Sequence, residues 1–156
     1  MHEVGYNYRI TDFQCALGSS QLEKLDRFVQ KRREIAKRYD ESFSGIDILK
    51  IPKNNFSIDH AYHLYPLQID FDKLSLTKSE FFEKMKQVGI NLQVHYIPIH
   101  LQPYYKRNYG FPSGYCLIAE NFYELAVSIP LYPSLTDTEV ERVVTNILGL
   151  LNRNSF

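Results

Sequence analysis

The same helix-start signal occurs three times in this sequence, each time before a run of apolar residues at helical spacing. In this signal a threonine is followed three residues later by glutamine or glutamate, and the two side chains cap each other's backbone N–H groups. The pairs are Thr11 with Gln14, Thr77 with Glu80, and Thr136 with Glu139. Because an amphipathic helix must bury its apolar stripe, the sequence predicts helices that cover a common core.

Short apolar segments between these helices predict strands. We expect strands over 46–51, 61–71, 90–95 and 126–129, and a further helix over 115–125. Pro66 makes the second of these strands either an edge strand or a kinked one. One long helix is predicted over 11–45, with a weak point near Gly18-Ser19-Ser20. This order of elements predicts an α/β or α+β fold, with helices packed on a small sheet.

The composition excludes several classes of protein. Eighteen Lys and Arg balance eighteen Asp and Glu, which removes a general attraction to nucleic acid or anionic membranes. The basic run Lys31-Arg32-Arg33 therefore reads as a solvated helix face. No apolar stretch reaches membrane-spanning length, and Met1-His2-Glu3 does not resemble a secretory signal. Cys15 and Cys116 lie far apart in the sequence and predict buried, reduced thiols, so we expect a cytoplasmic protein.

Residues 5–9, Gly-Tyr-Asn-Tyr-Arg, form the first candidate site. They directly precede a helix N-terminus, which offers unpaired backbone donors and a favourable dipole to an anion. Asn7 adds an amide donor and Arg9 a guanidinium suited to phosphate. A surface turn with two packed tyrosines is the alternative, and the residue types alone favour that alternative.

A second candidate site follows the strand predicted at 90–95. There His95, Tyr96 and His100 lie on a loop stiffened by Pro98 and Pro103, and loops at strand ends are common places for ligands. The alternative is that His95 is a hydrogen-bonded core residue and His100 is exposed to solvent. The residue types do not decide between the two.

The sequence gives little support for a metal or for a cysteine nucleophile. His60 and His63 have a spacing that is common by chance, and no cysteine or acidic residue completes a ligand set with them or with the other histidines. Neither cysteine has a local signature of a nucleophile, and no glycine-rich phosphate loop is present. We therefore expect no metal site.

Three segments, taken in order along the chain, resemble the sugar-nucleotide aminotransferases of the DegT/DnrJ/StrS family. They are Gly5–Asp12 with the following 16–18, 21–22 and 25–26, then His95–Tyr105, then Ser128–Thr136. The resemblance covers essentially the whole chain. The form Gln93-Val94-His95-Tyr96-Ile97-Pro98 looks most like the branch that acts on UDP-linked 4-keto-6-deoxy-N-acetylhexosamines in pseudaminic acid synthesis.

The resemblance implies the C-terminal part of a fold-type I enzyme that uses pyridoxal 5'-phosphate. Such enzymes move an amino group, usually from glutamate, to a keto sugar carried on UDP or dTDP, and they work as homodimers with shared active sites. Asn7 matches the asparagine that reaches the cofactor phosphate of the neighbouring subunit. Tyr6 and Arg9 match positions near the cofactor or the phosphates of the nucleotide sugar, and we assign them to substrate binding. The loop that lines the substrate side carries His95, Tyr96 and His100.

The departures from the family concern what the chain lacks. Family members are more than twice as long, and their Schiff-base lysine lies in a large N-terminal domain whose sequence context has no match here. We therefore expect no catalytic residue in this chain and little or no activity from it alone. The resemblance divides the chain into a dimer and cofactor contact loop (1–10), a connecting helix (11–45) and a small domain (46–156).

Two explanations of the short chain remain open. The first is that it is part of an aminotransferase, either a fragment or one half of a split enzyme whose other half carries the lysine. The second is that it is a non-catalytic interaction or dimerisation module. In each case the small domain lacks its usual neighbour, so we expect an exposed apolar face and self-association. Neither nucleic acid nor a membrane is an expected partner.

Overall fold

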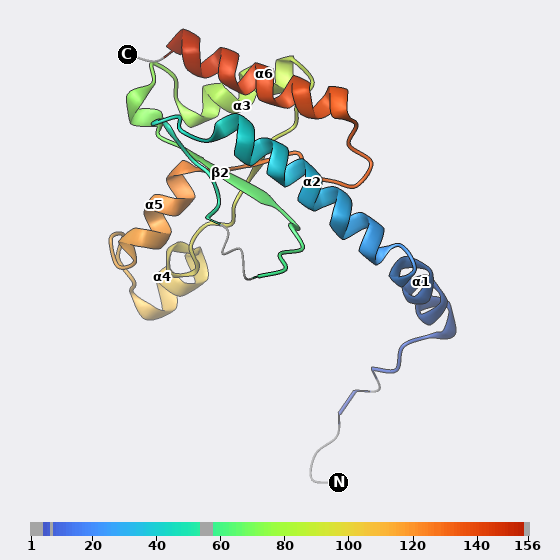
Figure 1. Ribbon diagram of the computed structural model, residues 1–156. Helices are drawn as coiled ribbons and strands as arrows, with labels where there is room; N and C mark the ends of the chain where they lie inside the picture. The colour runs from blue at the N-terminus through green and yellow to red at the C-terminus, as the bar shows by residue number, and fades with distance from the viewer. Residues whose placement is uncertain (1–4, 7, 54–57, 155–156) are drawn as a thin grey trace.

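The computed structural model describes residues 5–6, 8–53 and 58–154. Figure 1 shows a small central sheet in the described part of the chain, with helices on both of its faces. Its strands are β1 (Leu49–Lys50), β2 (Tyr65–Ile69), β3 (Gln93–Val94) and β4 (Ala126–Ile129). They are antiparallel and lie in the order β1-β2-β4-β3, so the strand latest in the sequence is inserted between the two before it.

Three helices cover one face of the sheet, and shorter helices lie on the other side (Figure 1). The first group is α2 (Leu25–Phe43), α3 (Lys78–Gln87) and α6 (Asp137–Asn154). The second group is α4 (Pro103–Tyr109) and α5 (Leu117–Leu125), and α1 (Asp12–Leu22) lies beyond the end of α2. All four residues of β4 are buried because both of its faces are covered. The predicted α+β architecture is confirmed, whereas α4 and the 3-10 turns Phe71–Lys73 and Ile99–Leu101 were not predicted.

The three predicted capping boxes are all present. At α1 the Thr11 side chain accepts from the Gln14 N–H, and the Gln14 side chain accepts from the Thr11 N–H. Thr77 and Glu80 make the same two bonds at α3. At α6 the Thr136 N–H donates to Glu139 Oε2 at 2.8 Å, and the Glu139 N–H donates to Thr136 Oγ1 at 3.3 Å. These starts were predictable because each depends only on residues three apart.

Replacing Thr136 with alanine is expected to lower the free energy of unfolding by about 1 kcal/mol, because an orphan donor of α6 loses its acceptor. Urea unfolding, followed by circular dichroism, measures this change. Thr138→Ala is the matched control, since Thr138 is exposed and lies within the same first turn. An equal loss in both variants would show that the cap contributes nothing of its own.

The long helix predicted over 11–45 is divided in two. The break is at Glu23–Lys24 rather than near Gly18-Ser19-Ser20, which lie inside α1. Helix α1 has no buried residue, whereas α2 buries Ile35, Ala36, Tyr39 and Phe43. Packing therefore fixes the direction of α2, whereas no buried contact holds α1.

Strands β1, β2 and β3 are shorter than predicted, and β2 is not an edge strand along its whole length. Pro66 pairs with Ser128 of β4, but β1 pairs only with Gln68 and Ile69. At Pro66, therefore, β2 has no neighbour on the β1 side, and a proline is tolerated at such an edge position. The predicted edge position is correct locally.

Two surface predictions are wrong. Cys15 and Cys116 are exposed rather than buried, because α1 has no buried residue and Cys116 lies at the exposed start of α5. The basic run is not simply solvated: Arg32 donates to the carbonyls of Tyr62 and His63, both at 3.2 Å. Within the described residues, no helix combines the length and apolar character needed to cross a membrane.

Candidate functional site

The first predicted site lies in the segment before α1. Tyr6 and Tyr8 are 85% and 87% exposed, and their rings are 5.7 Å apart. Arg9 is exposed and makes no hydrogen bond or ion pair with any described residue. Asn7 lies outside the described residues. The segment thus offers donors to a ligand or another chain, but it encloses nothing itself.

The second predicted site is the loop that follows β3. Its three predicted residues differ sharply in burial: Tyr96 is 95% exposed, His95 is half-buried and His100 is 8% exposed. Each histidine ring is hydrogen-bonded to one side chain outside the loop: His95 to Ser128 of β4, and His100 to Glu120 of α5. The predicted alternative of an exposed His100 is therefore wrong.

His95 is held by β4. Its Nε2 lies 2.9 Å from Ser128 Oγ, and its ring meets the Phe122 ring edge-on with centroids 5.4 Å apart. Burial, assisted by the positive charge of Lys78, lowers the pKa of His95 below its usual value. A neutral imidazole held at one nitrogen is suited to donate or accept one further hydrogen bond to a ligand.

His100 is held by α5. Its Nε2 lies 2.8 Å from Glu120 Oε1, and that carboxylate also accepts from the N–H groups of Gly114 and Cys116. The backbone of Gly114 and the ring of His100 lower the pKa of Glu120, which favours its charged form. His100 is therefore an internal anchor of the loop, while Tyr96 points into solvent.

Ser128 and Glu120 were not among the predicted site residues. Ser128 is a polar residue in an otherwise apolar strand, and that pattern could have indicated a buried hydrogen-bond partner. Glu120 lies in the first turn of α5, where an acidic residue is common whether or not it has a second role. Both pairs join residues far apart in sequence, so spacing alone could not reveal them.

The two predicted sites do not meet within one chain. Figure 1 shows α1 and the segment before it at the opposite end of the molecule from α4 and α5, which flank the second site. Donors from the first site can reach the second only if another chain or subunit brings them there.

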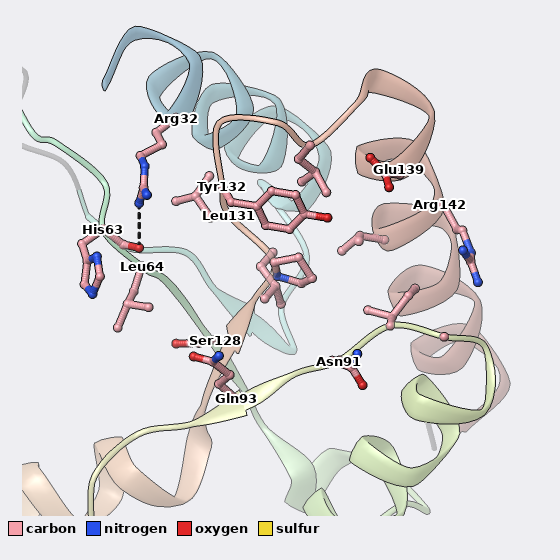
Figure 2. A pocket seen from close by; sticks show the side chains of 16 residues that line it. Arg32, His63, Leu64, Asn91, Gln93, Ser128, Leu131, Tyr132, Glu139 and Arg142 are labelled. Atoms are coloured by element: carbon pink, nitrogen blue, oxygen red, sulfur yellow. Dashed lines mark hydrogen bonds between the residues drawn. The ribbon is translucent and has the colours of Figure 1, made fainter. Parts of the chain in front are cut away.

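A cavity of about 520 Å³ lies between α2, β4 and α6, and Figure 2 shows its polar lining. Three of those polar groups already serve the fold. Arg32 holds the carbonyl of His63, Glu139 caps α6, and Arg142 binds the carbonyl of Val88. None of the predicted site residues lines this cavity.

The loop after β3 instead borders a larger, open hollow of about 850 Å³ formed with α5. Its lining is mainly apolar and aromatic and includes His95, Tyr96, Tyr115, Leu117 and Ile118. Leu117 and Ile118 are 70% and 90% exposed.

Exposed apolar side chains also follow α1, so the predicted apolar surface is present in two places. On α1 they are Phe13, Leu17 and Leu22.

No group of three His, Cys, Asp or Glu side chains within the described residues could hold a metal ion. Lys78 shares one property with catalytic lysines, because burial lowers its pKa. Its Nζ, however, donates to the carbonyl of Tyr123 at 2.6 Å and lies over the Tyr123 ring. That ammonium group is thus engaged in a contact between the start of α3 and Tyr123 of α5.

Comparison with known proteins gives one consistent family. The model of the DegT/DnrJ/EryC1/StrS aminotransferase family matches residues 1–148. SpsC, a spore coat polysaccharide biosynthesis protein of Bacillus subtilis, is 40% identical over 94% of this chain and 38% of its own length. The UDP-4-amino-4,6-dideoxy-N-acetyl-beta-L-altrosamine transaminase of Campylobacter jejuni is 35% identical over 98% of this chain and 40% of its own.

A solved structure agrees with these sequence relatives. Helicobacter pylori PseC, an aminotransferase involved in the biosynthesis of pseudoaminic acid, superposes with a TM-score of 0.83 at 29% identity. The match covers 97% of this chain and 40% of PseC. This chain spans about two fifths of the length of the relatives that it matches.

Proposed function

The chain belongs to the DegT/DnrJ/EryC1/StrS aminotransferase family, and from that membership we propose that it is the C-terminal part of a sugar-nucleotide aminotransferase. The whole enzyme would transfer an amino group from glutamate to a UDP- or dTDP-linked 4-keto-6-deoxy sugar, in the synthesis of a surface polysaccharide or glycan. Support for the sugar class comes from the names of the Campylobacter and Helicobacter relatives. The observation that carries the proposal is the family match over residues 1–148.

Pyridoxal 5'-phosphate would be the cofactor, and it supplies an electron sink for the carbon that bears the amine. This chain would contribute only to its phosphate. Asn7 would contact the cofactor phosphate in the partner subunit of a homodimer. Tyr6 and Arg9, next to it in the sequence, would contact the substrate there. The exposure of Tyr6 and Arg9, in a segment that lies away from the rest of the chain, fits a contact made in another subunit.

The loop after β3 would bind the nucleotide sugar. His95 would offer a ring nitrogen and Tyr96 its exposed phenol, while His100 would act from within the loop by holding it in place. The half-burial of His95 and its bond to Ser128 support this assignment, since a positioned donor binds with a smaller loss of entropy than a mobile one.

The lysine that carries the cofactor would lie in a separate or preceding part of the enzyme. The domain division therefore remains as proposed: a contact loop at 1–10, a connecting segment at 11–45 and a small domain at 46–156. We further place the enzyme in the cytoplasm, in keeping with its two free cysteines. The apolar surfaces of α1 and of the hollow beside α5 would be covered by the missing part.

Activity measured with and without a lysine-bearing N-terminal part tests the proposal. With pyridoxal phosphate, glutamate and a UDP-linked 4-keto-6-deoxy-N-acetylhexosamine, we expect no turnover from the 156-residue chain and turnover once the two parts are combined. In the combined enzyme His95→Ala should lower kcat/KM by about tenfold or more, because a bond to the substrate is lost. Thr145→Ala, on the exposed face of α6, is the control and should leave kcat/KM unchanged.

The exposed apolar surfaces also favour a second candidate, a non-catalytic interaction module. That module would bind a partner but would give no turnover with any lysine-bearing part. Binding without turnover in the mixing experiment would therefore favour the module, and turnover would exclude it.

A further inference from the structure

Glu120 brings together groups from two separate segments of the chain. Gly114 N–H lies 2.9 Å from each carboxylate oxygen, and Cys116 N–H lies 3.3 Å from Oε1. His100 Nε2, from the 3-10 turn Ile99–Leu101, lies 2.8 Å from the same Oε1. We propose that Glu120 is a positioning residue that holds the substrate-binding loop through His100. This role rests on the proposed function of that loop.

The loop is anchored at two points, with the exposed residue between them. His95 is fixed to Ser128 at the end of β3, and His100 is fixed to Glu120 five residues later. Between them Tyr96 is 95% exposed, and Pro98 has a fixed φ of −49°. Because so short a segment is held at both ends, the direction of Tyr96 depends on both anchors.

Backbone contacts hold the Glu120 carboxylate in place independently of His100. The N-cap residue of α5, Cys116, makes no side-chain cap, and Glu120 turns back to accept from the backbone donors there. A negative charge at a helix N-terminus is also favoured by the helix dipole. Gly114 has a φ of +86°, a conformation that glycine adopts readily and that directs its N–H at the carboxylate.

The arrangement favours a carboxylate over an amide. Both oxygens of Glu120 accept from Gly114, and Oε1 also meets Cys116 and His100. A glutamine has one acceptor oxygen, and its NH₂ group would face an N–H donor at the other position. Glu120→Gln therefore keeps the shape of the side chain, replaces the charged acceptor of the His100 bond with a neutral one and loses one contact to Gly114, so its hold on the loop is weakened.

The first experiment examines the imidazole of His100 by NMR in the 156-residue chain, without substrate. We expect a slowly exchanging Nε2–H proton in the natural chain, and exchange about tenfold faster or more in Glu120→Gln. Glu124→Gln, one turn later on the exposed side of α5, is the matched control and should leave the signal unchanged. An unchanged His100 signal in Glu120→Gln overturns the proposal, because Glu120 would then only cap its own helix.

The second experiment measures substrate kinetics in the combined enzyme. Glu120→Gln and His100→Gln should each raise KM by about tenfold, and the double variant should be no worse than the more affected single variant, since both break one connection. Additive losses, or an unchanged KM, overturn the positioning role. If Glu120→Gln does not fold, Glu120→Asp keeps the charge at the helix start and withdraws it from His100, and the same KM effect is expected.

The two experiments separate the failure of this role from the failure of the proposed function. Turnover by the natural enzyme with an unchanged KM in Glu120→Gln rejects the positioning role and leaves the proposed function standing. No turnover from any natural combination rejects both, whatever the NMR signal shows.

Discussion

Phe81→Ala is expected to lower the free energy of unfolding by about 3–5 kcal/mol, the largest effect of any single substitution considered. Phe81 lies on the inner face of α3 and is 0% exposed. Its ring meets that of Phe71 edge-on, with centroids 5.9 Å apart. Truncation removes these contacts and leaves a cavity, because the close-packed surroundings relax only in part.

Phe82→Ala provides a control at the next position. Phe82 has the same chemistry and lies on the same helix, but it is only partly buried. We expect a clearly smaller loss there. Urea unfolding of both variants, compared at their midpoints, measures the difference. Equal losses would mean that burial against the sheet does not determine the stability of α3. Since small domains are stable by only about 5–15 kcal/mol, Phe81→Ala should come close to unfolding the chain.

Self-association of the 156-residue chain is the second large effect expected. Phe13 and Leu17 are 81% and 55% exposed and lie one turn apart on α1, which has no buried residue. Residues four apart share a helix face, so the two side chains form one apolar patch. Burying such side chains contributes roughly 1.5–3 kcal/mol each, which favours any contact that covers them.

Replacing both residues with glutamine should weaken self-association by about a hundredfold, because two apolar contacts are lost. Glutamine is a good helix former, so α1 itself should remain. Sedimentation equilibrium over a range of concentrations measures the dissociation constant. Ile58→Gln is the control, since Ile58 is also exposed but lies outside α1. A natural chain that stays monomeric, or a double variant that associates as before, would show that α1 is not the contact surface.

The same apolar surfaces relate the fold to the proposed function. This chain spans about two fifths of the length of its relatives, and under the proposed function a lysine-bearing part would cover these surfaces. Substituting α1 should therefore reduce both self-association and recombination with a lysine-bearing part if the two contacts overlap. The hollow beside α5 is a separate surface and would still be available.

Local sequence determined the starts of three helices and the bounds of one strand. Thr11, Thr77 and Thr136 begin helices because their partners lie only three residues away, and the strand 126–129 was predicted at its observed bounds. The family, too, followed from short motifs within the chain, and the match over residues 1–148 confirms it.

Tertiary structure alone decided what depends on distant partners. Helix α2 buries four residues whereas α1 buries none, and the order β1-β2-β4-β3 follows from which strands pair across the sheet. The environments of His95 and His100 come from Ser128 and Glu120, which lie 33 and 20 residues away. A sequence pattern reports neighbours along the chain, whereas the burial and the hydrogen bond that set a histidine's properties come from residues the fold brings to it.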